Sequence, residues 1–314
     1  MLSSATVQRF CLTTCCAWLA MSTGCQTVAD RNERQTPTLP IRFQKSWPGL
    51  LTSARTQAKN FRESIRAIPS HQRDWRSDLT VLPYADISSD KVRFCNIRDC
   101  VYRAEDEYDV RHFDREIQLT DVQTIDFIVV PFKETPLLAH TMLSFGFSDG
   151  TYLVFSVEAR LQKGQNYAAV GGAMNQFELM YIVGTEKDLI RLRTHVRKVD
   201  VYLYPIRATP AQVQKVFLRA VARVNQIARQ PEFYETITNN CTTNIVDLIN
   251  GIKPGEIPDD IRVLLPGHSD KMAYDLGLLA VQGPFDQIKA ASKINLAAEL
   301  NYDAYDFSQR IRQR

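Results

Sequence analysis

The sequence predicts an α+β fold, and three features of its 314 residues support this prediction. Between residues 79 and 206, β-branched and aromatic side chains alternate with polar ones in runs of strand length, which is typical of a half-buried sheet. A helical pattern follows, starting from the cap residue Thr209 and Pro210 in the first helical position, and ending before Pro231. The hydrophobic content of 45% is enough to fill a sizeable core.

The start of the chain has the layout of an export signal. Arg9 precedes an apolar stretch over residues 10–21 that is too short to span a bilayer. The small residues before Cys25 resemble the lipobox of bacterial lipoproteins, with Ser22 where that motif usually has leucine. We therefore expect residues 1–24 to be a signal peptide and Cys25 to carry lipid, which places the chain in the bacterial periplasm, anchored to the outer membrane. Ordinary secretion with a chance cysteine is the alternative.

The next two segments connect the predicted anchor to the folded body. Residues 25–46 are polar and contain two prolines, which suits a tether. Residues 47–78 are predicted as a helical N-terminal segment that Pro69 closes. The apolar face of this helix is formed by Leu51, Ala54, Ala58, Phe61, Ile65 and Ile68.

The predicted core domain comprises residues 79–250, and its strands come before most of its helices. Strands are expected at residues 92–94, 100–103, 125–132, 138–147, 151–160, 177–183, 189–196 and 199–206. Residues 251–314 are predicted as a cover of short helices, interrupted by a loop at residues 264–270.

Export determines which cysteines remain in the mature chain and whether they can form disulfides. Removal of the signal leaves Cys25, Cys95, Cys100 and Cys241. Cys95 and Cys100 are close enough in the sequence for a small disulfide loop in an oxidising periplasm, although spacing alone does not fix the geometry. Cys241 is then left without a partner, as a buried, intermolecular or reactive thiol.

Two apolar runs flank a turn at residues 148–150 and predict a β-hairpin. Apolar side chains occupy odd positions in both runs, so odd positions must face odd positions. A three-residue loop with Gly150 in the left-handed conformation satisfies this condition, whereas a two-residue loop does not. The resulting register places His140 directly across from Glu158.

The even face of this hairpin gathers the polar residues of the candidate site. Glu158 is positioned to hold the His140 imidazole in one tautomer and to support its cationic form. The alternative is a solvated polar face with a chance His/Glu pair. Substrate-binding or supporting roles are predicted for Ser144, Ser156, Arg160 and Asn240.

Cys241 follows Asn240, a good helix cap, and shares an apolar helix face with Ile245 and Leu248 until Gly251 ends the helix. The unpaired N–H groups and positive dipole at a helix start lower a thiol pKa and stabilise an oxyanion. Buried cysteines are also common as simple core residues, and the pattern alone leaves both interpretations open. A histidine on the adjoining sheet favours a Cys/His nucleophile pair.

Several longer segments resemble a known family. They are AHTMLSFGFSDGTYLVFSVEAR, YIVGTEKDLIRLRT, VYLYPI, FYETITNNCTTNI and LLPGHSDKMAYDLGLL. In this order they resemble the Lnb N-terminal periplasmic domain family, named after a lipoprotein N-acyltransferase, from about residue 79 to near the C-terminus. The order of histidine before Asn-Cys is also similar to permuted NlpC/P60-type thiol enzymes, which implies a papain-like sheet packed on the cysteine helix.

The resemblance implies that Cys241 is the nucleophile and His140 the base, whereas the role of Glu158 comes from the hairpin register alone. The acyltransferase that gives the family its name has membrane-spanning segments after this domain. No such segment is found in this sequence, so a lipid on Cys25 is the expected attachment.

Other classes of site find no support in the sequence. The net charge of +3 and the absence of a basic tail argue against a nucleic-acid partner. His71, His112, His195 and His268 lack partners at ligand spacing, so we expect surface histidines and neither metal nor cofactor. The basic run at residues 191–198 is predicted to be a strand with one solvated face, with a lipid headgroup contact as the second interpretation.

The expected function is acyl transfer by an envelope thiol enzyme that uses Cys241, His140 and Glu158. A lipid or lipoprotein acyl group is the expected substrate. The alternatives are a cell-wall amidase or peptidase acting on peptidoglycan, and a binding or scaffolding lipoprotein in which the Cys/His pair is structural.

Overall fold

The computed structural model describes residues 68–166 and 177–313. These residues belong to the larger of two units in the chain, Thr52–Arg314. The predicted signal peptide, the lipidation site Cys25, the tether and all but the last residue of the predicted helix at 50–68 lie outside the described residues. Of the rest of the predicted helical N-terminal segment, only the 3-10 turn η1 (Ser77–Leu79) is helical.

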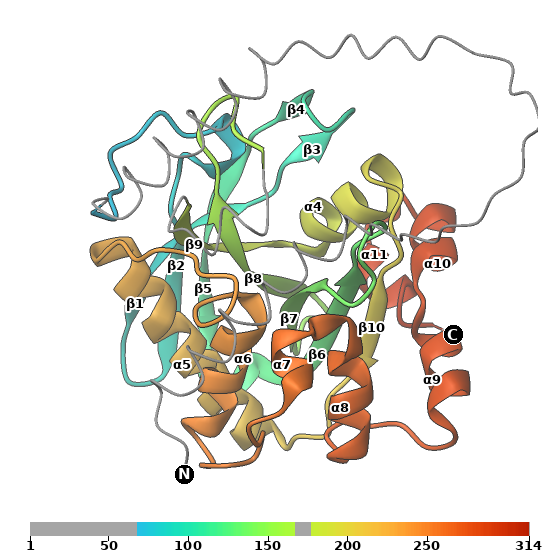
Figure 1. Ribbon diagram of the computed structural model, residues 1–314. Coiled ribbons are helices and arrows are strands. Elements are labelled where there is room, and N and C mark those ends of the chain that lie inside the picture. The colour runs from blue at the N-terminus through green and yellow to red at the C-terminus, as the bar shows by residue number, and fades with distance from the viewer. Residues whose placement is uncertain (1–67, 167–176, 314) are drawn as a thin grey trace, which may run out of the picture. The chain divides into compact units, whose positions relative to one another are not determined.

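The described part of the chain is built on one large sheet with helices packed against it, which confirms the α+β class (Figure 1). The strand order is β1-β2-β9-β8-β7-β6-β10, and β5 pairs with β2. All pairs are antiparallel except that of β2 with β9. The strands are β1 (Tyr84–Ile87), β2 (Lys91–Arg98), β5 (His112–Gln118), β6 (Val122–Pro131), β7 (Ala139–Phe147), β8 (Tyr152–Arg160), β9 (Glu178–Thr185) and β10 (Tyr202–Pro205).

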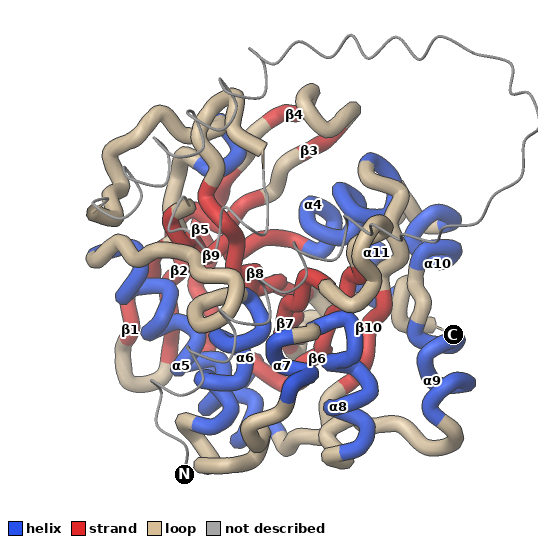
Figure 2. The backbone as a smooth tube through the Cα atoms, viewed as in Figure 1, coloured by secondary structure: helices blue, strands red, loops and turns tan. Residues whose placement is uncertain are grey.

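A separate two-stranded sheet, β3 (Val101–Tyr102) and β4 (Tyr108–Asp109), is inserted between β2 and β5. A second 3-10 turn, η2 (Leu119–Asp121), connects β5 to β6. The strand and helix layers can be followed in Figure 2, where the central strands form one continuous group behind the helices.

The hairpin of β7 and β8 has the predicted register. Gly150 is in the left-handed region with φ of 79°, and the Phe147 N–H donates to the Thr151 carbonyl at 3.0 Å. The pairing continues to Met142 opposite Ser156, so the even positions of both strands share one face. Regular pairing of β7 with β8 ends at this pair, and His140 and Glu158 lie two residues further along their strands, away from the turn.

Two long helices cover the odd face of this hairpin. Helix α5 (Pro210–Arg229) begins with a capping box at Thr209, and α6 (Cys241–Asn250) lies beside it in front of the sheet (Figure 1). Phe217 of α5 packs edge-to-face against Phe145 and Phe155 of the hairpin. Both predicted helices are therefore confirmed, and the apolar periodicity of each identifies the side that faces the sheet.

The predicted strand at residues 189–196 is wrong. The segment continues α4 (Glu186–Arg191) into a turn of π-helix, η3 (Leu192–Val196). Thr185 starts this helix by accepting a hydrogen bond from the Asp188 N–H, a capping signal that the alternating basic residues obscured. Arg193 is buried, so the predicted solvated face for the basic run is also wrong.

Residues 251–313 contain five short helices. The helices are α7 (Ile261–Leu264), α8 (Ser269–Asp275), α9 (Phe285–Ser292), α10 (Asn295–Leu300) and α11 (Phe307–Arg310). The predicted loop at 264–270 is wrong, because the 3-10 turn η4 (Pro266–His268) leads directly into α8. None of the helices in the described ranges is long and apolar enough to cross a membrane.

The predicted disulfide is not formed, since Cys95 and Cys100 are both free and buried. Cys95 lies within β2, whereas Cys100 lies beyond the end of that strand and packs with Tyr102 and Leu192. The two thiols therefore lie in different surroundings despite their short spacing in the sequence.

Candidate active site

Cys241 is the first residue of α6, and the preceding residue, Asn240, caps this helix. The Asn240 side-chain oxygen accepts hydrogen bonds from the Thr242 and Thr243 N–H groups at 2.8 and 2.9 Å. These contacts satisfy two of the unpaired donors at the helix start. Cys241 is buried, and its thiol lines a cavity of about 210 Å³ that Asn240 also lines.

The backbone N–H of Cys241 has no hydrogen-bond acceptor among the described residues. At the first helical position this donor also carries the positive end of the helix dipole. A donor in this place is suited to stabilise negative charge on an oxygen bonded to a carbon that the Cys241 sulfur attacks.

His140 enters the same cavity from β7. Its Nε2 lies 2.7 Å from the Ser156 hydroxyl and 3.2 Å from Oε1 of Glu158. The Ser156 hydroxyl donates its hydrogen to Glu158 at 2.6 Å, so it can only accept from Nε2–H. This arrangement fixes the tautomer of the neutral ring and leaves Nδ1 unprotonated and available to take the proton of the Cys241 thiol.

The proximity of imidazole and thiol changes the pKa of both groups. Burial opposes ionisation of Cys241, but the charge of His140 and a hydrogen bond from it outweigh burial and lower the thiol pKa to about 7. Burial also disfavours the charged imidazole, yet Glu158 and Cys241 raise the His140 pKa to about 9. Between these two values the pair exists as a thiolate and an imidazolium, which is the reactive form of a cysteine nucleophile.

Glu158 supports the imidazolium and is itself held by an arginine. Burial opposes ionisation of this carboxyl, but His140 and Arg193 outweigh it and hold the Glu158 pKa well below its usual value. Arg193 donates to Oε1 of Glu158 at 3.0 Å and to the Leu189 carbonyl at 2.8 Å. Its side chain is only 3% exposed, so the π-helical turn presents a buried cation to the carboxylate.

Arg193 was missed as a site residue because the strand prediction placed it on a solvated face. Its contact with Glu158 also shows that the even face of the hairpin is largely covered by neighbouring elements. Ser144 and Ser156 on that face are both fully buried, and α4 contributes Glu186 as the acceptor for the Ser144 hydroxyl at 2.6 Å.

The structure separates two of the predicted supporting residues from the cavity. Ser144 bonds to Glu186, as described above, and does not line the cavity. Arg160 donates to the Leu79 and Thr80 carbonyls and stacks on Trp75. Both residues were predicted from the alternation of β7 and β8, which gives the face of a strand but not the position along it.

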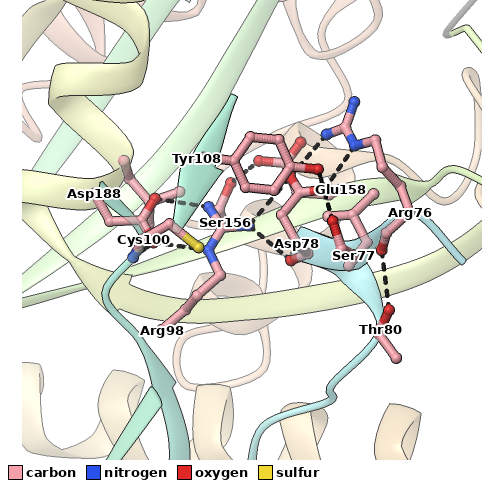
Figure 3. Close-up of polar contacts among 12 residues, drawn as sticks. Arg76, Ser77, Asp78, Thr80, Arg98, Cys100, Tyr108, Ser156, Glu158 and Asp188 are labelled. Carbon is pink, nitrogen blue, oxygen red and sulfur yellow. Dashed lines mark hydrogen bonds and ion pairs between the residues drawn. The ribbon is translucent and has the colours of Figure 1, made fainter. Parts of the chain in front are cut away.

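The far end of the cavity carries a second polar group that the sequence did not indicate. Arg98 forms two hydrogen bonds of 2.8 Å with Asp188, which also accepts the Cys100 N–H. Arg76 binds both oxygens of Asp78, and Asp78 lies 3.8 Å from Arg98. Figure 3 shows this network with Ser156 and Glu158, and Arg76, Asp78, Arg98 and Glu158 all line the same cavity.

Comparison with protein families gives one match. The model of the Lnb N-terminal periplasmic domain matches residues 108–267, about half of the chain. The chain belongs to the Lnb N-terminal periplasmic domain family. His140, Glu158, Arg193 and Cys241 all lie within the matched residues of this Lnb domain.

The Lnb domain assigns the chain to a periplasmic family of envelope proteins. The match is shorter than the resemblance described from the sequence, and Asp78 and Arg98 at the far end of the cavity precede it. Neither the search of curated proteins nor that of solved structures gave a match. Over the described residues, no group of three or more His, Cys, Asp or Glu side chains is placed to hold a metal ion.

The Glu158→Gln variant of this Lnb domain tests the support that Glu158 gives to His140. Loss of the negative charge lowers the His140 pKa from about 9, so less imidazolium is present at neutral pH and the Cys241 pKa rises from about 7. We expect the midpoint of Cys241 alkylation by iodoacetamide, followed against pH, to move upward. Glu116→Gln removes an exposed carboxylate on β5 and serves as the control. A midpoint that stays at about 7 in Glu158→Gln contradicts the supporting role.

Proposed function

We propose that this chain is an envelope thiol enzyme of acyl transfer, with Cys241 as nucleophile, His140 as base and acid, and Glu158 as support for the imidazole. One observation carries the proposal. A cysteine with a lowered pKa, its histidine and a helix N–H that has no acceptor in the described part of the chain converge on one cavity. Apart from the charged group around Arg98, the other walls of this cavity are mainly apolar. This combination favours an acyl group over the sugars and peptides of peptidoglycan as the substrate.

The reaction begins with the Cys241 thiolate and the His140 imidazolium. The sulfur attacks the carbonyl carbon of an ester or amide donor, and the new oxyanion is placed at the Cys241 N–H. The carbon–oxygen or carbon–nitrogen bond then breaks, and His140 gives its proton to the departing alcohol or amine. The acyl group remains on Cys241 as a thioester.

The second half returns the enzyme to its starting state. An amine or a water molecule attacks the thioester carbon while the neutral His140 takes a proton from it. The carbon–sulfur bond breaks, and the products are an amide or a carboxylic acid and the Cys241 thiolate beside the His140 imidazolium. His140 loses and regains its positive charge during these steps, whereas Arg193 stays charged. Arg193 therefore keeps Glu158 ionised even while His140 is neutral.

The order of the two reactive residues, with His140 before Cys241, supports kinship with permuted NlpC/P60-type thiol enzymes. The proposed place of the chain is the periplasm, attached through a lipid on Cys25 to the outer membrane. A membrane attachment brings the cavity near lipid donors, which fits the apolar walls around the thiol.

Mass spectrometry of the intact protein tests the proposal. Phospholipid vesicles incubated with the protein are expected to add the mass of one acyl chain to Cys241, in a form that hydroxylamine removes. Cys241→Ala is expected to show no such addition, and Cys100→Ser, which removes a thiol outside the cavity, is expected to behave as the unsubstituted protein. A thiol that gains no acyl group, together with release of peptide fragments from peptidoglycan, shows the amidase alternative to be correct.

The pH dependence of acyl transfer gives a second prediction from the same pair. Thiolate is required for attack and imidazolium for protonation of the leaving group, so the rate is expected to rise with pH through about 7 and to fall above about 9. The initial rate of acyl-enzyme formation measured between pH 5 and 10 checks this. A rate that keeps rising between pH 9 and 10 contradicts an acid role for His140.

A further inference from the structure

A second cavity lies on the odd face of the sheet, under the two long helices. Its size is about 130 Å³, and it is bounded by β6, β7, α5, α6 and α8 (Figure 1). The walls are formed mainly by aliphatic and aromatic side chains, among them Phe127, Leu143, Val216, Ile245, Val246 and Met272. It is separate from the cavity that contains Cys241, although Thr242, the next residue of α6, lines it.

The walls offer almost nothing that a polar ligand can bind. Two buried hydroxyls line the cavity, and both already have partners. Thr242 bonds to Thr141 at 3.0 Å, and Ser269 donates to the Pro266 carbonyl at 2.7 Å. A peptide or a sugar in this cavity leaves its own polar groups without partners, which costs free energy. A hydrocarbon chain has no such cost.

Apart from these two hydroxyls, the polar residues of the lining lie at its solvent-facing part. Lys253 is paired with Glu256, and Gln212 is used in the capping box of α5. Arg207 is exposed, and its guanidinium has no hydrogen-bond or ion-pair partner in the described part of the chain. A free cation next to an apolar cavity complements a ligand with an apolar tail and an anionic head.

We infer that this cavity binds part of the hydrocarbon chain of one anionic lipid, with the carboxylate or phosphate head at Arg207, since an apolar cavity of similar size holds a group of about six carbons. The site is non-covalent and does not depend on the reactivity of Cys241. It is distinct from the cavity of the proposed acyl transfer, because the two cavities have no lining residue in common.

The fluorescent fatty acid cis-parinaric acid is a direct probe of this site. We expect saturable binding to the full chain carrying Cys241→Ala, which excludes thioester formation. Val246→Phe and Val216→Phe fill the cavity from two different helices, and each is expected to weaken binding at least about tenfold. Ala159→Phe, which places the same bulk in the cavity of Cys241, is the matched control and is expected to leave the affinity unchanged.

The predicted contact between Arg207 and an anionic head group is tested by removing the charge from either partner. Arg207→Gln is expected to weaken cis-parinaric acid roughly tenfold and to leave binding of the corresponding alcohol unchanged. Dodecyl phosphate is expected to compete with the probe, whereas inorganic phosphate is not, which separates a lipid head group from a free anion.

Two results overturn the inference. One is the absence of saturable binding. The other is binding that Ala159→Phe abolishes while Val246→Phe and Val216→Phe preserve it, which places the chain in the cavity of Cys241. Failure of the proposed acyl transfer is recognised separately, because an inert Cys241 in the unsubstituted protein with retained probe binding rejects the thiol chemistry and leaves this site intact.

Discussion

Alkylation of Cys241 by iodoacetamide at pH 7 is expected to be at least about 50-fold slower in His140→Asn than in the unsubstituted protein. With the thiol pKa at about 7, half of Cys241 is thiolate at this pH. Asparagine removes the imidazolium charge and leaves burial to act alone, so the pKa rises above the ordinary value of 9.0. About one thiol in a hundred or fewer is then ionised at pH 7, and the thiolate is the form that reacts.

Peptide mass mapping measures this rate at each cysteine separately. Cys100 is the internal control, because burial and the charge of Asp188 raise its pKa to about 12 and keep it unreactive in both proteins. His112→Asn removes a histidine on β5 that does not line the Cys241 cavity, and its alkylation profile is expected to match that of the unsubstituted protein. Equal rates in His140→Asn and the unsubstituted protein, or a Cys241 that reacts only after unfolding, make this thiol a core residue and favour the binding-protein alternative.

The sequence was informative where local patterns determine the structure. The left-handed glycine at Gly150 and the odd-to-odd rule fixed the hairpin register, and this register correctly brought His140 and Glu158 within 3.2 Å of each other. The cap at Asn240 likewise predicted where α6 begins and therefore that Cys241 occupies its first turn. Both features depend on contacts within a few residues, so a single sequence contains the necessary information.

Contacts between distant segments could not be predicted in this way. Arg193 reaches Glu158 over 35 positions in the sequence, and the alternation of charged and apolar residues around it is as typical of a strand as of this short helix. Arg98 and Asp188 are 90 positions apart, and neither residue has a local signal for its partner. The disulfide prediction failed for the opposite reason, because two cysteines close in sequence pack in different places, Cys95 within β2 and Cys100 beyond its end against Leu192.

The ion pair of Arg98 and Asp188 carries the largest expected effect on stability. Asp188 is fully buried, and the Arg98 side chain is only 5% exposed. Asp188→Asn preserves the shape of the side chain but replaces one acceptor oxygen by a donor that faces the guanidinium. Arg98 keeps its hydrogen bond to the Asp78 carbonyl at 3.1 Å, but the nearest remaining negative charge is the Asp78 carboxylate at 3.8 Å. Breaking a buried pair in this way costs about 3–5 kcal/mol of unfolding free energy.

Urea unfolding of Asp188→Asn measures this cost, and Asp109→Asn is the matched control. Asp109 also pairs with an arginine, Arg103, but both side chains are about half exposed, at 47% and 51%, so solvent replaces the lost contact and little change is expected. A loss below about 1 kcal/mol for Asp188→Asn means that water reaches Arg98 and that the far end of the cavity is open. Since Asp188 does not line that cavity, folded Asp188→Asn is expected to keep the Cys241 alkylation midpoint at about 7. Loss of stability without a change in that midpoint separates the residues that hold the cavity together from those that activate the thiol.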